Sequence, residues 1–188
     1  MTRQEAVEYD NELKCKMEQV AEEYSLNAAI GADIVDKYIM ILPDDARKGM
    51  IFLGNTPSSY KRGNITYDLK KAMVAGLELT SAMNEPENFF NYVQLLIVVI
   101  FFIQKSMKID LNKLEAFVVY YLHKENAYHT GIDEEKFIDN FRVWYHEYTG
   151  KMLEVREIQD SINRLYTLKC VDIIEGSVFL KERVAGNV

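Results

Sequence analysis

The chain contains 188 residues, of which 48% are hydrophobic and 27% are charged, and its formal net charge is −7. This composition supports a folded core of one domain or two small ones, and it excludes an intrinsically disordered chain. The negative charge disfavours non-specific attraction to nucleic acid, because that attraction depends on Lys and Arg side chains that neutralise phosphates.

The cysteines and the N-terminus predict a cytoplasmic protein. Cys15 and Cys170, the only two cysteines, are far apart in the sequence and lack a metal-ligand spacing, so we expect free thiols in a reducing compartment. The first residues turn acidic at once and contain no apolar segment of the kind that a signal peptide requires.

Helices dominate the structure predicted for residues 1–109. Thr2 and Glu5 form a capping-box pattern that begins the first helix, and a second helix is expected from near Asn27. Two apolar runs on either side of a turn rich in Pro, Asp and Gly predict a short β-hairpin at about 39–53.

The most apolar segment of the chain is 92–103, with the sequence YVQLLIVVIFFI. It is shorter than the roughly 20 residues that span a bilayer, and polar residues border it on both sides. We therefore interpret it as the centre of a buried helix over about 87–107 and not as a membrane contact. Pro86 suits the first turn of this helix, and another helix is expected before it, over about 67–83.

The loop 54–64 holds the only dense basic cluster of the sequence, with Lys61 and Arg62. It is rich in Gly, Pro and Ser, but it lacks the Gly-Lys-Ser/Thr sequence of a phosphate-binding P-loop. We expect a solvated surface loop, and a contact with phosphate or with an acidic partner is the alternative.

From residue 110 onward, the order of the predicted elements becomes informative. Asp133 is a good N-cap residue for the second helix of this part, and Gly150 ends that helix. The connector before Asp133 has room for one extended strand. The expected elements are a helix over 111–125, a second helix between 133 and 150, a third helix over 154–169 and a β-hairpin over 170–183.

This order of three helices and a two-stranded hairpin resembles the winged-helix superfamily. The resemblance covers about 110–184 and rests on element order and on the apolar spacing of VREIQDSINRLYTLKCVDIIEGSVFLKE, not on a chemical motif. It implies a mainly α fold of the α+β class, with a winged-helix-like domain over 110–188 after the helical region 1–109. The connection 146–154 is longer than the tight turn that usually joins the second and third helices of this superfamily.

In winged helices that bind DNA, the third helix typically enters the major groove. Here that helix offers Arg156, Gln159 and Asn163, whose side chains suit base edges, but it also carries carboxylates that would lie near phosphates. Acidic residues outnumber basic ones in this part of the chain, so sequence-specific DNA binding by a transcriptional regulator is the second hypothesis. The candidate DNA contacts are Arg156, Gln159, Asn163 and Arg164 on the helix, Lys181 and Arg183 on the hairpin, and Lys61 and Arg62 in the loop.

Contact with another protein is the first hypothesis. The chain has 12 Tyr and 9 Phe, and aromatic side chains buried at an interface with a polar rim would let a non-enzymatic adaptor or regulatory subunit hold a partner chain or a second copy. Core packing is the alternative role for each of these side chains. The candidate partner contacts are Tyr120, Tyr145, Tyr148 and Tyr166.

The sequence contains no recognisable catalytic or metal-binding pattern. Its three histidines, His123, His129 and His146, match no zinc spacing. Gly-x-Ser-x-Gly, His-Glu-x-x-His and Gly-x-Gly-x-x-Gly motifs are missing, and paired carboxylates lie at expected turns or helix starts, where they satisfy backbone N–H groups. We therefore expect no enzyme activity, no cofactor and no metal.

Overall fold

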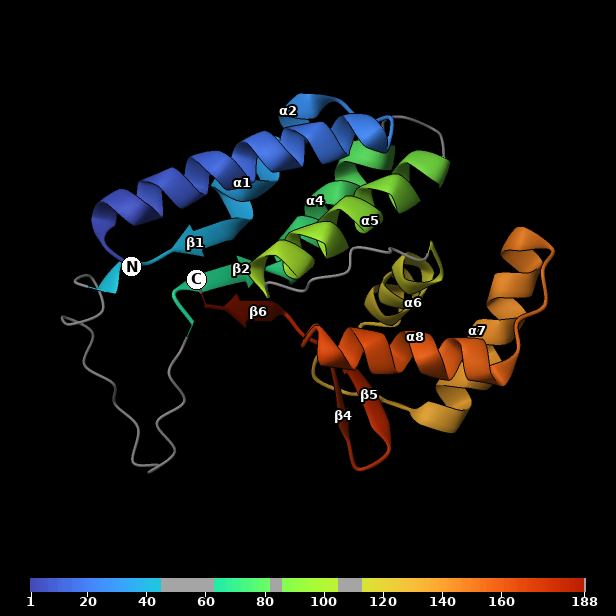
Figure 1. The fold of residues 1–188 in the computed structure, drawn as a ribbon. Coiled ribbons are helices and arrows are strands. Elements are labelled where there is room, and N and C mark those ends of the chain that lie inside the picture. The colour runs from blue at the N-terminus through green and yellow to red at the C-terminus, as the bar shows by residue number, and fades with distance from the viewer. Residues whose placement is uncertain (45–62, 82–85, 105–112, 188) are drawn as a thin grey trace.

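The structure is a computed structural model that describes residues 1–44, 63–81, 86–104 and 113–187. Within these residues the protein is mainly helical and contains two antiparallel sheets of three strands each (Figure 1). The predicted fold class, mainly α with some β, is confirmed. The predicted boundary between residues 109 and 110 lies outside the described residues.

The first two helices form a closely packed pair at the N-terminus. The capping box is present as predicted, because the Glu5 N–H donates to the Thr2 hydroxyl at 3.2 Å and the Thr2 N–H donates to the Glu5 carboxylate at 2.7 Å. The helices approach each other closely at Gly31, where a Cβ would collide with the Met17 backbone. The helices are α1 (Arg3–Glu23) and α2 (Ala28–Tyr38).

One sheet joins the two ends of the chain. Its strands are β1 (Ile39–Ile41), β2 (Ile65–Asp68) and β6 (Arg183–Gly186). They lie in the antiparallel order β1-β2-β6, with Met40 opposite Thr66 and Thr66 opposite Ala185. Thus β1 pairs with β2, and the second half of the hairpin predicted at about 39–53 lies outside the described residues.

The helix predicted over about 67–83 begins later than expected. Its first two predicted residues belong to β2, in which the alternate residues Ile65 and Tyr67 are fully buried, so a period of two describes this segment better than a helical one. The Asp68 carboxylate accepts a 3.2 Å hydrogen bond from a backbone N–H of the next helix and so caps its N-terminus. That helix, α4, spans Leu69–Ser81.

The predicted central helix is the most deeply buried element of the fold. This helix, α5, spans Pro86–Ile103, and all of its residues from 92 to 101 are buried. It packs against α1, α4 and β6. Among the described residues, no helix combines the length and the apolar character that a membrane span requires.

The C-terminal part contains the predicted three helices and the hairpin. Asp133 caps the second helix by accepting a 3.1 Å hydrogen bond from the Lys136 N–H, and Gly150 ends it in the left-handed conformation. The hairpin turns through Glu175 and Gly176, both with positive φ, as a two-residue type I′ turn requires. The elements are α6 (Lys113–Lys124), β3 (Ile132–Asp133), α7 (Glu134–Thr149), α8 (Val155–Thr167), β4 (Val171–Ile174) and β5 (Ser177–Leu180).

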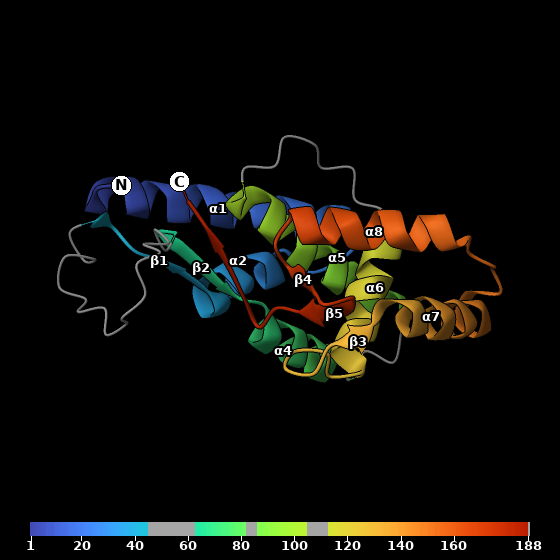
Figure 2. The ribbon, with the colours of Figure 1, turned by 90° about the horizontal axis from the view of Figure 1, so that it is seen from below.

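The second sheet has the strand order β3-β5-β4. In Figure 2, α6 lies between α7 and α8. Buried side chains from Leu13 of α1 to Val184 of β6 form one hydrophobic core that runs through both parts of the chain. The N-terminal and C-terminal parts are therefore packed against each other and not merely linked.

The hydroxyl of Tyr67 lies in this core without a hydrogen-bond partner among the described residues. Burial raises the pKa of this phenol well above its usual value. An unpaired buried hydroxyl costs about 1–3 kcal/mol, so we expect Tyr67→Phe to leave the free energy of unfolding unchanged or to raise it by about 1 kcal/mol. Urea denaturation followed by far-UV circular dichroism measures the change.

Tyr92→Phe is the matched control for this substitution. The Tyr92 hydroxyl is also buried, but it donates a 2.9 Å hydrogen bond to the Ala72 carbonyl oxygen. We expect the control variant to lose about 1 kcal/mol of stability. Equal destabilisation by the two substitutions would show that the Tyr67 hydroxyl is paired as well.

Candidate functional site

The most extensive group of aromatic contacts lies where α5, α6 and α7 meet. Tyr120 of α6 contacts Phe89 and Trp144, with ring centroids 4.9 and 5.6 Å away. Tyr148 of α7 contacts Phe90 at 5.4 Å and Trp144 at 5.7 Å. We call this group the aromatic cluster, and its members are Phe89, Phe90, Phe117, Tyr120, Tyr121, Phe137, Phe141, Trp144, Tyr145 and Tyr148.

Three of the four candidate tyrosines belong to the aromatic cluster. Tyr120 and Tyr145 are half-buried, and burial raises the pKa of Tyr120. Tyr148, near the end of α7, is 45% exposed. Tyr166 lies on α8, outside the cluster, and is 50% exposed. The inner rings therefore pack the helices together, while Tyr148 forms an exposed edge of the same cluster.

Exposed apolar side chains lie near Tyr148 in the sequence, from α7 to the start of α8. Val143, Met152 and Val155 are 60%, 67% and 41% exposed. The connection between the two helices is anchored, because Leu153 is buried and its carbonyl oxygen accepts a 3.1 Å hydrogen bond from Arg142 Nε. We call the exposed set the α7–α8 surface, a name that groups exposed apolar residues near one another in the sequence and not on a single helix face, and its members are Val143, Tyr148, Met152 and Val155.

The three residues predicted to read base edges are exposed on α8. Arg156, Gln159 and Asn163 all lie outside the core. Arg156 Nε is 3.9 Å from a carboxylate oxygen of Asp160, one helical turn away. The opposite side of the helix packs into the core through Ile158, Ser161, Ile162 and Leu165.

Arg164, also predicted to contact DNA, is engaged inside the fold. Its Nη1 lies 3.2 Å from Oε1 of Glu115, whose side chain is only 2% exposed. Its guanidinium also lies 5.4 Å from the ring centroid of Phe101, near the end of α5. Arg164 thus connects α8 to both α6 and α5, and this geometry favours a packing role over a role in reading DNA.

The cations predicted on the hairpin also have carboxylate partners. Lys181 Nζ lies 2.9 Å from Asp172 Oδ1, and Arg183 Nε lies 3.6 Å from Asp68 Oδ2. Arg183 belongs to β6, beyond the hairpin, and its partner comes from β2. The remaining predicted DNA contacts, which lie outside the described residues, are Lys61 and Arg62.

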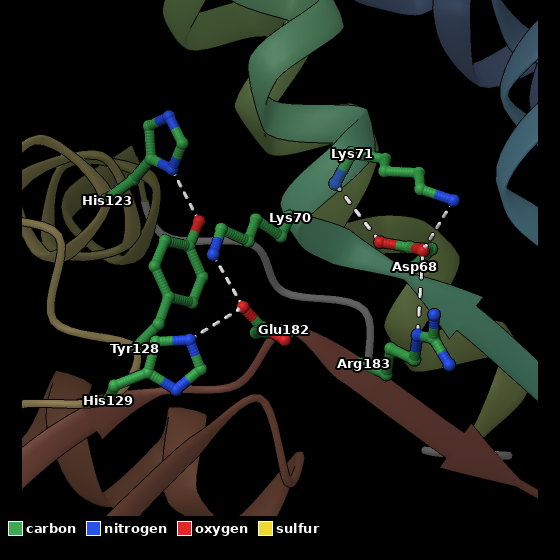
Figure 3. Close-up of polar contacts among 8 residues, drawn as sticks. All are labelled: Asp68, Lys70, Lys71, His123, Tyr128, His129, Glu182 and Arg183. Atoms are coloured by element: carbon green, nitrogen blue, oxygen red, sulfur yellow. Dashed lines mark hydrogen bonds and ion pairs between the residues drawn. The ribbon is translucent and has the colours of Figure 1, made fainter.

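A network of polar contacts connects α4 to the C-terminal part (Figure 3). Lys70 Nζ of α4 lies 2.5 Å from Glu182 Oε1, and the Lys70 N–H donates to the Glu182 carbonyl oxygen at 3.0 Å. The same ammonium lies 4.6 Å from the ring centroid of Tyr128, whose hydroxyl is hydrogen-bonded to His123 Nδ1. His129 Nε2 lies 3.3 Å from Glu182 Oε1. We call this network the polar seam, and its members are Asp68, Lys70, Lys71, His123, Tyr128, His129, Glu182 and Arg183.

The environment of the polar seam shifts the pKa values of three of its members. Burial, and to a lesser extent the Lys70 ammonium, lower the pKa of His123. Burial raises the pKa of Tyr128, and the negative charges of Glu182 and Asp68 add to this effect. The hydrogen bond from Lys70 lowers the pKa of Glu182. At neutral pH the seam therefore combines a neutral imidazole, a neutral phenol and a Lys–Glu ion pair.

The part of the chain that the structure describes contains no group of metal ligands, and Cys170 holds a buried thiol. Within that part, no three His, Cys, Asp or Glu side chains are grouped so that they could hold a metal ion. Cys170 is buried, and burial raises the pKa of its thiol to about 12, so the thiol stays protonated at neutral pH.

No protein-family model matches the chain, and neither a curated protein nor a solved structure matches it. No relative therefore bears on the resemblance to winged helices, which stays a prediction from element order and apolar spacing.

Sequence reasoning missed the polar seam and the packing role of Arg164. Lys70 and Glu182 are 112 positions apart, and no local pattern connects them. The packing role of Arg164, by contrast, could have been predicted from the sequence around Glu115. Glu115 interrupts an apolar run on the same helix as Phe117, and a carboxylate at a buried position requires a cation or hydrogen-bond donors.

Arg164→Ala tests the packing role of this residue. We expect the free energy of unfolding to fall by about 2 kcal/mol, because the substitution removes the guanidinium that pairs with buried Glu115 and lies against Phe101. Arg156→Ala is the matched control on the same helix. Since Arg156 is exposed, we expect a change within about 0.5 kcal/mol. Urea denaturation measures both values, and equally small losses would refute the packing role.

Proposed function

We propose that the chain is a cytoplasmic, non-enzymatic adaptor or regulatory subunit that holds a protein partner on the α7–α8 surface. The observation that carries the proposal is the position of Tyr148, a partly exposed ring that also contacts Phe90, Phe117 and Trp144. An aromatic side chain that is already held by its neighbours loses little conformational entropy on binding, and residues of this kind dominate the energetics of protein interfaces.

The apolar neighbours of Tyr148 in the sequence favour the same role. Val143 and Met152 expose more than half of their surface to solvent, on a helix and on an anchored connection. Covering them with a partner would remove apolar area from water at about 25 cal/mol per Å². Charged residues such as Glu147 and Lys151 lie close by in the sequence and would contribute a polar rim.

We also propose that residues 113–180 form a unit of the winged-helix type. Three helices precede the hairpin, and the short strand β3 between the first two helices pairs with β5 of that hairpin. In this unit α8 takes the place of the helix that reads DNA in other members. Its neighbouring cations are largely paired with carboxylates, which favours a protein partner over a nucleic acid.

Charge substitutions on the α7–α8 surface test the adaptor proposal. Val143→Asp and Met152→Asp place a carboxylate on exposed positions and leave the inner rings untouched. We expect each to reduce the amount of partner protein that co-purifies with the tagged chain from its natural host by at least about tenfold, because an unpaired charge buried at an interface costs more than 1.4 kcal/mol. Quantitative mass spectrometry measures the recovery.

Asn163→Asp is the control, because it adds the same charge to an exposed position of α8 outside that surface. It should leave the recovery unchanged. Light scattering after size-exclusion chromatography decides whether the partner is a second copy of the chain. A wild-type chain that stays monomeric at all concentrations and recovers no protein would eliminate the proposal.

DNA binding by α8 is the second candidate function. The observation that favours it is the exposure of Arg156, Gln159 and Asn163, whose spacing places them on one side of the helix. This candidate predicts salt-sensitive binding to duplex fragments, which Arg156→Ala weakens about tenfold or more. Mobility-shift assays at low salt measure it. Under the adaptor proposal we expect no shift, and a shift that Arg156→Ala weakens would overturn that expectation.

A further inference from the structure

The polar seam lies at the link between β5 of the C-terminal hairpin and β6 of the sheet β1-β2-β6. Glu182 stands between β5 of the hairpin and β6 of the sheet, and Lys70 of α4 holds it through both a side-chain ion pair and a backbone hydrogen bond. Tyr128 and His129 approach from the connector after α6 (Figure 3). Three segments that are distant in the sequence thus meet at one carboxylate and one ammonium.

His123 is the member of the seam whose protonation changes the contacts most. With Nδ1 unprotonated, the imidazole accepts the hydrogen bond of the Tyr128 hydroxyl. Protonation turns Nδ1 into a donor, so the imidazolium can only donate to the Tyr128 hydroxyl, and it creates a second cation, half-buried, beside the Lys70 ammonium. The Lys70 ammonium lies over the Tyr128 ring, so repulsion between the two cations weakens the contact between α4 and the connector.

We propose that the polar seam is an acid-sensitive latch, in which protonation of His123 releases α4 from the Tyr128 connector and loosens the link at Glu182. This regulatory step goes beyond the adaptor role and does not depend on it. The latch lies on α4, the end of α6, the connector after it and the link between β5 and β6, whereas the partner surface lies on α7 and α8.

Lys70 is the charged group that acts on His123, and the other charged groups of the seam do not cancel this response. Lys70 comes from α4, Glu182 and Arg183 from the link and β6, and Asp68 from β2. Glu182 stays ionised to lower pH than an ordinary carboxyl group, because the hydrogen bond from Lys70 lowers its pKa. His129 Nε2 also lies 3.3 Å from Glu182 Oε1. That side chain is 75% exposed, however, so solvent screens the contact.

The direction of the pH effect follows from the lowered pKa of His123. We call the latch closed when the contacts of the seam are made and open when they are broken. In the open state, His123 binds a proton near the usual histidine pKa of about 6.5, and in the closed state it does so only at lower pH. Closure is therefore fully favoured above about pH 6.5 and weakens as the pH falls below that value, until the closed state is protonated too. One proton changes the opening equilibrium by at most about tenfold per pH unit.

Hydrogen–deuterium exchange of the full chain tests the latch. Protection factors are compared at pH 7.5 and 5.5 after correction for the pH dependence of intrinsic exchange. In the wild-type chain we expect protection of the Lys70 amide and of β6 to fall by up to about tenfold at pH 5.5, while the buried centre of α5 stays unchanged. Equal protection of the seam at both pH values would overturn the proposal.

His123→Gln and His129→Gln form the matched pair of variants. A glutamine at 123 still offers an acceptor to Tyr128 but does not titrate, so this variant should lose the acid response. The variant at 129 should keep it. An unchanged acid response in His123→Gln would overturn the proposal. If that variant fails to fold, an NMR titration of wild-type His123 decides, because a pKa at or above about 6.5 would overturn it as well.

Discussion

The burial of α5 is the constraint on which the rest of the structure depends. This helix is apolar on nearly all sides, so it needs neighbours all around it, whereas an amphipathic helix needs neighbours along only one stripe. Those neighbours come from both ends of the chain: α1 and α4 from the N-terminal part, and α6 and β6 from the C-terminal part. Each fully buried Leu, Ile or Phe contributes roughly 1.5–3 kcal/mol, so covering α5 favours the docking of the two parts more strongly than any single polar contact does.

The two ends of α5 also determine where the C-terminal part is held. Near its start, Phe90 stacks on Phe117 of α6 and contacts Tyr148 of α7, so the aromatic cluster continues the core to the protein surface. Near its end, Phe101 lies under the guanidinium of Arg164 of α8. The helices α6 and α7 each contact α5 through aromatic rings, and α8 contacts it through a cation–π contact, in addition to general apolar packing.

The sequence predicted the elements that depend on short local patterns, and it did not predict the contacts between distant segments. The capping box at Thr2, the N-cap at Asp133 and the helix end at Gly150 are patterns within four residues, and all were correct. The buried helix α5 followed from its length and apolar character. The pairing of β2 with β6 joins residues more than a hundred positions apart, and the last two residues of the four-residue strand β2 were assigned to the helix that follows it. For the candidate site, the abundance of aromatic residues led to three tyrosines of the cluster, whereas the contacts among them and the polar seam join distant segments and have no local pattern.

The contacts that hold the C-terminal part differ in their sensitivity to acid. The guanidinium of Arg164 does not titrate, so its contact with Phe101 persists as the pH falls. The seam holds a histidine beside a lysine, so acid adds a like charge to it. Opening the seam would therefore leave α8 on α5 and change mainly the link between β5 and β6. The hairpin itself packs on α6, α7 and α8, so loosening of the link at Glu182 leaves the partner surface in place, which is why we separate the latch from the adaptor role.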